Sequence, residues 1–183
     1  MPDSWDGLPP RGSDVISLRL AVPSDAQALR LLRLEALQDN PAAFSADYEL
    51  TRAQTVSEWE ERIASQLETA TGAICAATTG GNLVGMCGIA TGHWPKTSHS
   101  ATIWGAYVKP QWRGAGIGRR MIDECLRWAK AHGATVAKLG VITSNEPAIR
   151  CYRRCGFTEY GIEPRAINFD GKTHDELLMG RTL

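Results

Sequence analysis

Three glycines at alternate positions form the part of this sequence best suited to chemistry. Gly114, Gly116 and Gly118 stand between an expected strand at residues 101–108 and an expected helix at residues 116–132. Without Cβ atoms, this backbone can adopt unusual dihedral angles and approach a ligand closely. The first amides of a helix have no intrahelical partner, and the positive end of the helix dipole lies behind them. The turn is therefore predicted to bind a phosphate group.

Arginine side chains flank this turn and increase its attraction for an anion. Arg113 precedes the glycines, and Arg119 and Arg120 follow them. An anion gains about 1–2 kcal/mol from a helix dipole, and charged hydrogen bonds from arginine add a comparable amount. The nucleotide P-loop is excluded because it ends in Gly-Lys-Ser or Gly-Lys-Thr, whereas Gly118 is followed by Arg119 and Arg120. The dinucleotide-binding fingerprint is excluded because it needs an acidic residue about 20 residues further on, where this sequence has Lys138. The glycines alone are also compatible with a tight turn whose arginines are solvated.

Two stretches of the chain together resemble a known family. The first, at residues 108–118, resembles motif A of the GNAT superfamily of N-acetyltransferases. Its core, Arg/Gln-x-x-Gly-x-Gly/Ala, is present here as Arg113, Gly116 and Gly118. The second, at residues 145–157, resembles motif B, Asn-x-x-Ala-x-x-x-Tyr-x-x-x-Gly-Phe, at every named position. The close resemblance covers residues 101–160, and only the order of the elements agrees outside it.

The resemblance implies an N-acetyltransferase that uses acetyl-coenzyme A (acetyl-CoA) as its cosubstrate. In this family the turn holds the pyrophosphate of acetyl-CoA, and the pantetheine arm pairs with exposed backbone of the preceding strand. The acetyl group passes directly to an amine of a small molecule, amino acid or peptide, so a covalent intermediate on Cys151 is rejected. The residues implied to bind the cosubstrate are Tyr107, Val108, Arg113, Gly114, Ala115, Gly116, Ile117, Gly118, Arg119, Asn145 and Tyr152.

The resemblance also implies two side-chain roles in motif B. Tyr152 is the implied general acid that protonates the leaving thiolate. Asn145 is implied to hydrogen-bond the pantetheine amide. Each residue has a simpler interpretation as well: Tyr152 can anchor its helix to the sheet, and Asn145 can be the N-cap of that helix.

The sequence offers several candidates for the general base. The strand at residues 101–108 has no carboxylate, although many members of the resembled family place a glutamate on or near it. The candidates are Glu49, His93 and His99, and a water relay is an equal alternative. Glu49 is our choice because we expect it in a loop that lines the acceptor pocket, which residues 40–60 and 91–99 are expected to build. Without a strong base, the site favours an amine of low pKa.

Hydrophobic patterns predict the elements that position these residues. Strands are predicted at residues 15–21, 73–79, 83–90, 101–108, 135–143, 157–163 and 175–182, and helices at 24–40, 57–69, 116–132 and 146–155. The order β-α-α-β-β-β-α-β-α-β-β fits an α/β (α+β) fold with a mixed, mostly antiparallel sheet flanked by helices, as the resemblance also implies. Residues 1–13, rich in Pro, Gly and Asp, are predicted to be a mobile tail, and residues 14–183 a single domain.

Composition excludes several other classes of function. Twenty basic residues balance twenty acidic residues, so nothing indicates a nucleic-acid or membrane partner. No apolar run has the length of a membrane span, and the N-terminus lacks a secretion signal. The five cysteines form neither a disulfide framework nor a metal site with zinc-ligand spacing. We therefore expect reduced thiols in a cytoplasmic protein without a metal.

A second class of function is compatible with the same residues. Because no base is identified, a non-catalytic acyl-CoA-binding sensor or regulatory module is the alternative to an enzyme. Release of free thiol with a panel of amines separates the two. A homodimer is a further expectation, because dimers are common among proteins that the chain resembles.

Overall fold

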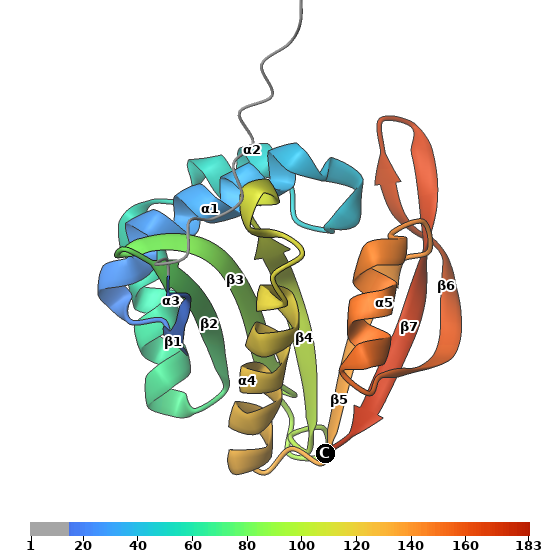
Figure 1. The fold of residues 1–183 in the computed structure, drawn as a ribbon. Coiled ribbons are helices and arrows are strands. Elements are labelled where there is room, and N and C mark those ends of the chain that lie inside the picture. The colour runs from blue at the N-terminus through green and yellow to red at the C-terminus, as the bar shows by residue number, and fades with distance from the viewer. Residues whose placement is uncertain (1–14) are drawn as a thin grey trace, which may run out of the picture.

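The computed structural model describes residues 15–183, so the tail predicted at residues 1–13 lies outside the described residues. Helices and strands follow one another around one sheet (Figure 1). The helices are α1 (Ala26–Asp39), α2 (Tyr48–Ala53), α3 (Val56–Thr69), α4 (Ile117–Ala131) and α5 (Glu146–Arg154). The strands are β1 (Ser17–Leu20), β2 (Gly72–Thr79), β3 (Asn82–Thr91), β4 (Ser100–Val108), β5 (Val136–Ile142), β6 (Thr158–Phe169) and β7 (Lys172–Thr182). Within residues 15–183, no helix is long and apolar enough to cross a membrane.

The sheet has seven strands in the order β1-β2-β3-β4-β5-β7-β6. Its parallel pair is β4 with β5, and the other neighbouring strands of the described chain pair antiparallel. The connection from β4 to β5 passes through α4, because parallel neighbours need a crossover. The predicted fold class, a mixed and mostly antiparallel sheet flanked by helices, is therefore confirmed.

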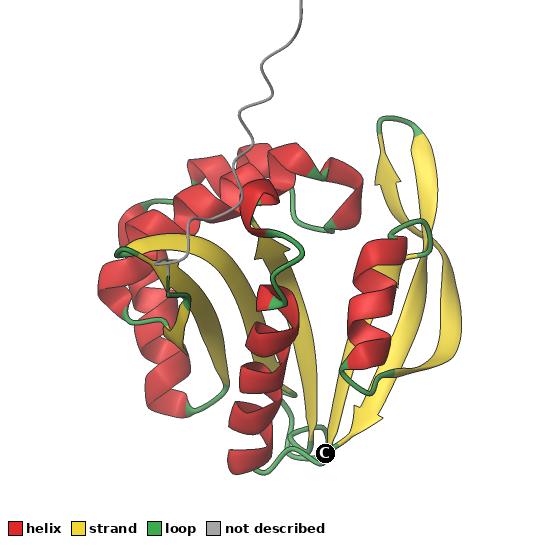
Figure 2. Ribbon diagram, viewed as in Figure 1, coloured by secondary structure: helices red, strands yellow, loops and turns green. Residues whose placement is uncertain are grey.

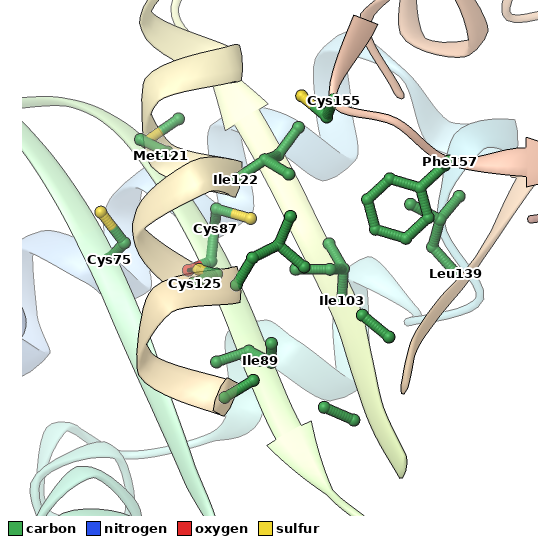
Figure 3. Packing of buried hydrophobic residues seen from close by; sticks show 14 of the residues in the cluster. Cys75, Cys87, Ile89, Ile103, Met121, Ile122, Cys125, Leu139, Cys155 and Phe157 are labelled. Atoms are coloured by element: carbon green, nitrogen blue, oxygen red, sulfur yellow. Dashed lines mark hydrogen bonds between the residues drawn. The ribbon is translucent and has the colours of Figure 1, made fainter. Parts of the chain in front are cut away.

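Helices cover both faces of this sheet (Figure 2). Alternate side chains of a strand point to opposite faces, so Cys75 of β2 packs into the core under α4, whereas Ile74 packs under α1 and α3. Figure 3 shows the first core, where Met121 and Cys125 of α4 meet Cys87 of β3. We name the two sides of the sheet the α4 face and the α1 face.

The strands β4 and β5 pair only where residues 100–102 lie beside residues 136–138. Beyond these pairs, the two strands diverge (Figure 1). We call residues 103–108 of β4 and 139–142 of β5 the splayed segments. Their facing backbone edges lack strand partners in the described sheet, so they can pair with an extended ligand.

A bulge in β4 accompanies this divergence. The register of β4 with β3 shifts between the pairs Met86–Tyr107 and Gly88–Trp104. Within the shift, Gly105 has a φ of 61°, a left-handed conformation that favours glycine. A bulge bends its strand, so Gly105 contributes to the curvature that separates β4 from β5.

Two local predictions differ from the structure. Residues 48–53 form the short helix α2 instead of a loop, because the Asp47 side chain caps it by accepting a hydrogen bond from the Leu50 amide at 2.8 Å. The last two strands are longer than predicted, because Asp170 and Gly171, with φ of 49° and 74°, form a tight two-residue turn.

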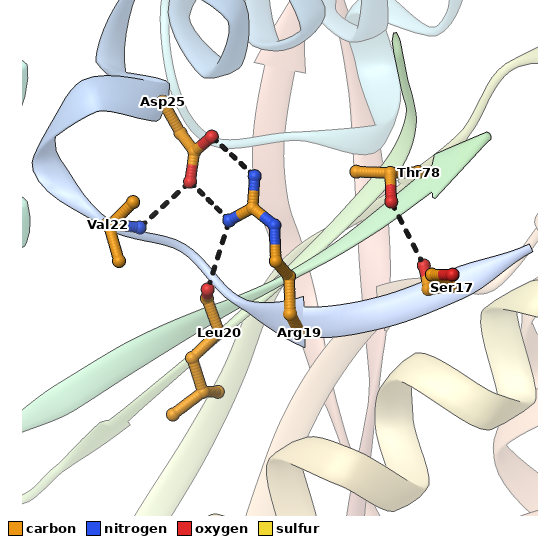
Figure 4. Close-up of polar contacts among 6 residues, drawn as sticks. All are labelled: Ser17, Arg19, Leu20, Val22, Asp25 and Thr78. Atoms are coloured by element: carbon orange, nitrogen blue, oxygen red, sulfur yellow. Dashed lines mark hydrogen bonds and ion pairs between the residues drawn. The ribbon is translucent and has the colours of Figure 1, made fainter. Parts of the chain in front are cut away.

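An ion pair braces the connection from β1 to α1 (Figure 4). The Arg19 guanidinium donates to both carboxylate oxygens of Asp25, at 2.6 and 2.7 Å. The same carboxylate accepts a hydrogen bond from the Val22 amide at 2.8 Å. These contacts lower the pKa of Asp25, mainly through the hydrogen bond from Arg19.

Candidate active site

The glycine turn leaves the N-terminus of α4 open. Gly114 and Gly116 have φ of 84° and 74°, and a Cβ on either would meet nothing within 4 Å. Glycine is therefore favoured at both positions by the backbone dihedral angle. Contacts with the rest of the protein would leave room for a side chain. No side chain caps α4, and its first backbone hydrogen bond runs from the Arg120 amide to the Gly116 carbonyl at 3.1 Å. The preceding amides lack intrahelical partners, so they fit an anionic group.

The two sequence motifs meet at this turn. A Cβ on Gly118 would lie 3.8 Å from the Cys151 sulfur of α5 and 4.0 Å from a Val108 methyl of β4. The N-terminus of α4, the end of β4 and one side of α5 are thus adjacent. Interaction with the Cys155 thiol lowers the pKa of the Cys151 thiol, which lies beside the turn.

The arginines predicted to assist phosphate binding have other partners. Arg113 donates from Nε to the Val108 carbonyl at 2.9 Å, and its Nη2 lies 3.8 Å from the Asp39 carboxylate of α1. Arg119 lies 3.7 Å from Asp123 on the surface of α4. Arg113 therefore fixes the end of β4 through its side chain, and the backbone of the turn carries most of the anion-binding capacity.

At the end of β4, the Tyr107 side chain is held by two acids, and the next residue directs its amide toward β5. Its buried hydroxyl donates to Asp39 at 2.5 Å and to Glu35 at 3.2 Å. Burial, followed by these two acids, raises its pKa. The Lys109 amide donates to the Val84 carbonyl of β3 at 2.9 Å. Because alternate residues of a strand present their amides to opposite edges, the Val108 amide points toward the splayed segment of β5.

Tyr152 stands on α5 and is half-buried, with its ring edge-on to Phe157 at 6.2 Å. Burial raises the pKa of its hydroxyl, and the nearby thiols of Cys87, Cys151 and Cys155 add to this effect. The hydroxyl is therefore protonated at neutral pH and can donate a proton. Asn145 accepts a hydrogen bond from the Ala148 amide at 3.3 Å, so its N-cap interpretation is confirmed while its amide nitrogen stays available.

The candidate bases from the sequence lie apart from the splayed segments or on the surface. Glu49 is exposed on α2, where its carboxylate pairs with Arg52 at 2.7 Å. His93 and His99 precede β4, at the end where β4 and β5 are paired. The loop at residues 92–99 therefore lies at the opposite end of β4 from the glycine turn.

Sequence reasoning missed Glu176, a carboxylate on β7. Its Oε2 lies 2.5 Å from the position that a Cβ on Gly140 of β5 would occupy. Gly140 belongs to the splayed segment, and its neighbours Leu139 and Val141 point into the core under α4. Glu176 therefore covers β5 on the α1 face. Burial, followed by the charge of Glu163 on β6, raises the pKa of Glu176.

A cavity of ≈ 320 Å³ lies between the α1–α2 connection and the β6–β7 hairpin. Its lining includes Leu37, Phe44, Tyr48, Ala166, Ile167 and Phe169. Part of the range 40–60 lines this space, which we call the acceptor-side cavity, and residues 91–99 are not in its lining. No group of three or more potential metal-binding His, Cys, Asp or Glu side chains occurs within residues 15–183.

Comparison with known proteins gives matches along most of the chain. A family model described as the acetyltransferase (GNAT) family matches residues 30–157. The N-alpha-acetyltransferase RimI of Mycobacterium tuberculosis is 36% identical over 96 residues, which are 52% of this chain and 58% of that protein. The chain spans 28% to 58% of the length of RimI and two further curated relatives.

Solved structures share the fold at lower identity. A GNAT-family acetyltransferase from Streptococcus pneumoniae has a TM-score of 0.84 and 24% identity, covering 92% of this chain and 100% of that one. The protein yncA from Salmonella typhimurium, described with its cofactor acetyl-CoA, has a TM-score of 0.80 and 18% identity, covering 92% and 94%. Since the family model matches more than half of the residues, the chain belongs to the acetyltransferase (GNAT) family.

Proposed function

We propose that this protein transfers an acetyl group from acetyl-CoA to the amine of a small molecule, an amino acid or a peptide. The observation that carries the proposal is the uncapped N-terminus of α4, which lies beside the splayed segments of β4 and β5. One feature accepts a diphosphate and the other an extended arm. The naming of RimI as an N-alpha-acetyltransferase and of acetyl-CoA with yncA supports this assignment.

The backbone does most of the proposed cosubstrate binding. The amides from Gly114 to Arg119 hold the diphosphate, which accounts for the roles of Ala115, Ile117 and Gly118. The exposed edge at Val108 pairs with the pantetheine arm, and the Val108 amide can stabilise the developing oxyanion. The backbone of Tyr107, also predicted to bind the arm, faces β3 by the same alternation, so Val108 carries this role. A donor of this kind contributes about 3 kcal/mol in the transition state. Asn145 contributes its free amide nitrogen.

In the proposed reaction, the neutral amine attacks the thioester carbonyl. The C–N bond forms, the C–S bond breaks, and the amine loses one proton to a base. Tyr152, which carries its proton at neutral pH, donates this proton to the leaving thiolate. The tyrosinate then regains a proton from solvent and the protonated base releases its proton to solvent, so the enzyme returns to its starting state.

We further propose Glu176 as the base, while Glu49 stays the prediction from the sequence. Glu176 borders the splayed segments and makes no ion pair within residues 15–183. Its raised pKa suits a proton acceptor near neutral pH. Glu163, directly across the strand pair, and His174 and Lys138, on strand positions of the same face, are the charged or titratable groups around it.

Several broader expectations belong to the same proposal. A protonated Tyr152 and an unpaired Glu176 on opposite faces favour turnover over a non-catalytic sensor. The free cysteines of the described chain fit a cytoplasmic protein with reduced thiols. Residues 14–183 are proposed to act as a single domain, and a homodimer stays a prediction.

The decisive experiment combines calorimetry with thiol detection. Acetyl-CoA should bind with micromolar affinity, and a panel of amines should release one free thiol for each amine acetylated. A folded protein that takes up no acetyl-CoA contradicts the proposal. Binding without thiol release for any amine would instead support the sensor alternative.

A further inference from the structure

Arg33 of α1 is an unusual buried cation. Its side chain is on the α1 face, only 8% exposed, and its guanidinium lies over the Phe44 ring at 4.5 Å. The buried Nη1 has no hydrogen-bond partner in the described chain. This atom lies 3.2 Å from the position that a Cβ on Gly105 would occupy, so it is directed at the bulge of β4.

A second arginine with the same property lies close to the first. Arg62 of α3 stacks on the Trp59 ring at 4.0 Å, and its Nε and Nη2 are buried without a partner among residues 15–183. The two charges repel each other: burial, followed by the charge of Arg62, lowers the pKa of Arg33 to about 10. Both guanidiniums therefore stay charged at pH 7.

Two acidic side chains of the same helix, by contrast, each lie near a cation from another part of the chain. Glu35 pairs with Lys109 at 2.9 Å, and Asp39 lies 3.8 Å from Arg113. No ion pair of the described residues includes Arg33 or Arg62. Stacking on an aromatic ring offsets part of the charge but satisfies none of the five N–H donors of a guanidinium. Buried cations of this kind require an acceptor, which a bound anion can supply.

The position of the pair indicates which ligand supplies that anion. The turn at α4 lies beside Cys151 and the core of the α4 face, whereas Arg33 lies on the α1 face. The ring of Phe44, which stacks on Arg33, also lines the acceptor-side cavity. Gly105 belongs to the splayed segment of β4, in which the Val108 amide is proposed to face the acetyl carbonyl. An anion held here is therefore part of the acceptor, close to its amine, and not the diphosphate.

We propose that Arg33 and Arg62 bind a carboxylate of the acceptor, so that the substrate class is amino acids with a free carboxylate near the amine. The planar fork of a guanidinium matches the two oxygens of a carboxylate. The inference rests on the proposed acetyl transfer and adds the class of acceptor to it.

The test uses matched pairs of acceptors on the full chain. L-Alanine, L-methionine and L-phenylalanine are each compared with their carboxamides by thiol release. The free acids should have at least about tenfold higher kcat/KM, which is a difference of about 1.4 kcal/mol in transition-state binding. Arg33→Gln and Arg62→Gln should remove this preference by lowering the kcat/KM of the free acids toward that of the carboxamides. The control Arg127→Gln, which removes an exposed charge from α4, should keep the preference.

Two further measurements keep the proposal falsifiable when turnover is low. With CoA present, N-acetyl-L-methionine should raise the Tm of the wild type, and neither its amide nor the Arg33→Met variant should give this shift. Without ligands, Arg33→Met should have a higher Tm than the wild type, because it removes an unpaired buried charge. A lower Tm would assign Arg33 a structural role and overturn the proposal.

The failures of the two proposals are distinguishable. Equal rates for acids and carboxamides, or a preference retained in both arginine variants, would overturn the carboxylate site while acetyl transfer stands. No binding of acetyl-CoA and no thiol release with any amine would overturn the acetyltransferase itself.

Discussion

The two faces of the sheet place different kinds of groups beside the same splayed segments. On the α4 face, these groups are backbone amides and the uncharged hydroxyl of Tyr152. On the α1 face, they are the charged side chains of Arg33 and Glu176, and Arg62 lies close to Arg33. Backbone amides can bind a phosphate with many different side chains around them. A charged side chain, in contrast, is gained or lost by a single substitution, so the ligand that it binds changes more easily. We therefore infer that the α4 face fixes the cosubstrate and the α1 face selects the acceptor.

Gly116→Val should have the largest effect and should break the α4 face alone. Gly116 has a φ of 74°, and a β-branched residue there is strained by about 1–3 kcal/mol. The turn can relieve this strain only by redirecting its amides, and the added side chain also blocks the close approach of the ligand to the backbone. The two effects together should lower acetyl-CoA affinity by about 1,000-fold. Calorimetry measures the affinity.

The matched control is Gly171→Val in the β6–β7 turn, where φ is also 74°. Gly171→Val introduces a similar strain, so it should lower the Tm as much as Gly116→Val does. Its affinity for acetyl-CoA should stay within about twofold of the wild-type value. If Gly116→Val binds acetyl-CoA normally, the amides of the turn do not form the diphosphate site.

Glu176→Gln should have the second largest effect and should break the α1 face. Loss of a general base reduces kcat by about 100-fold. In the wild type, kcat/KM should fall as pH drops through the raised pKa of Glu176, because the carboxyl group is then protonated. The variant should lack this acid limb in a pH–rate profile.

Glu49→Gln provides the comparison between the two candidate bases. Glu49 is 66% exposed and paired with Arg52, so its loss should change kcat by less than twofold. A large loss in Glu49→Gln with full activity in Glu176→Gln would assign the base to Glu49 instead.

Tyr152→Phe should lower kcat by less than Glu176→Gln does, and it should leave the acetyl-CoA site on the α4 face intact. A thiol with a pKa of about 8.5 is a good leaving group, so loss of the acid should lower kcat by about tenfold. The Kd of acetyl-CoA should not change. Tyr160→Phe is the control, because Tyr160 is 59% exposed on β6. Full activity in Tyr152→Phe would leave Tyr152 only its packing role against Phe157.

The α4 face could be predicted from the sequence because its residues are close to one another in the chain. The strand that ends at Val108, the glycines and the amphipathic stripe of α4 are continuous in the chain, so periodicity and turn chemistry locate them. The apolar side chains of α4 that recur at helical spacing, from Ile117 to Ala129, are buried. Even here, the partner of Arg113 could not be predicted, because Asp39 is remote in the sequence.

The α1 face could not be predicted, because its groups meet only through the order of strands. Glu176 reaches Gly140 because β7 inserts between β5 and β6. Arg33 reaches Gly105 because α1 crosses beneath the bulge of β4. Alternation along the last strand does indicate that Glu176 points away from Leu177, but it does not say which strand lies beside it.

The smallest expected effect is the change in unfolding free energy when Arg19, a paired arginine, loses its partner. It is compared with the effect of replacing the unpaired Arg33. Asp25→Asn removes the carboxylate that holds Arg19 and the Val22 amide. Because Arg19 is 46% exposed and its charge is screened, the loss of unfolding free energy should be only about 1 kcal/mol at pH 7. Arg33→Met should change the free energy in the opposite direction, since its charge has no partner.

The pH dependence of this loss tests its cause. The pKa of Asp25 is lowered in the folded state, so its contribution is complete above the unfolded carboxyl pKa of about 4. The contribution disappears as pH falls through the lower folded value, where the wild-type carboxyl is also protonated. Urea unfolding of the wild type and Asp25→Asn should therefore differ at pH 7 and converge in acid. A difference that persists in acid would mean that packing at Asp25, and not its charge, stabilises the connection from β1 to α1.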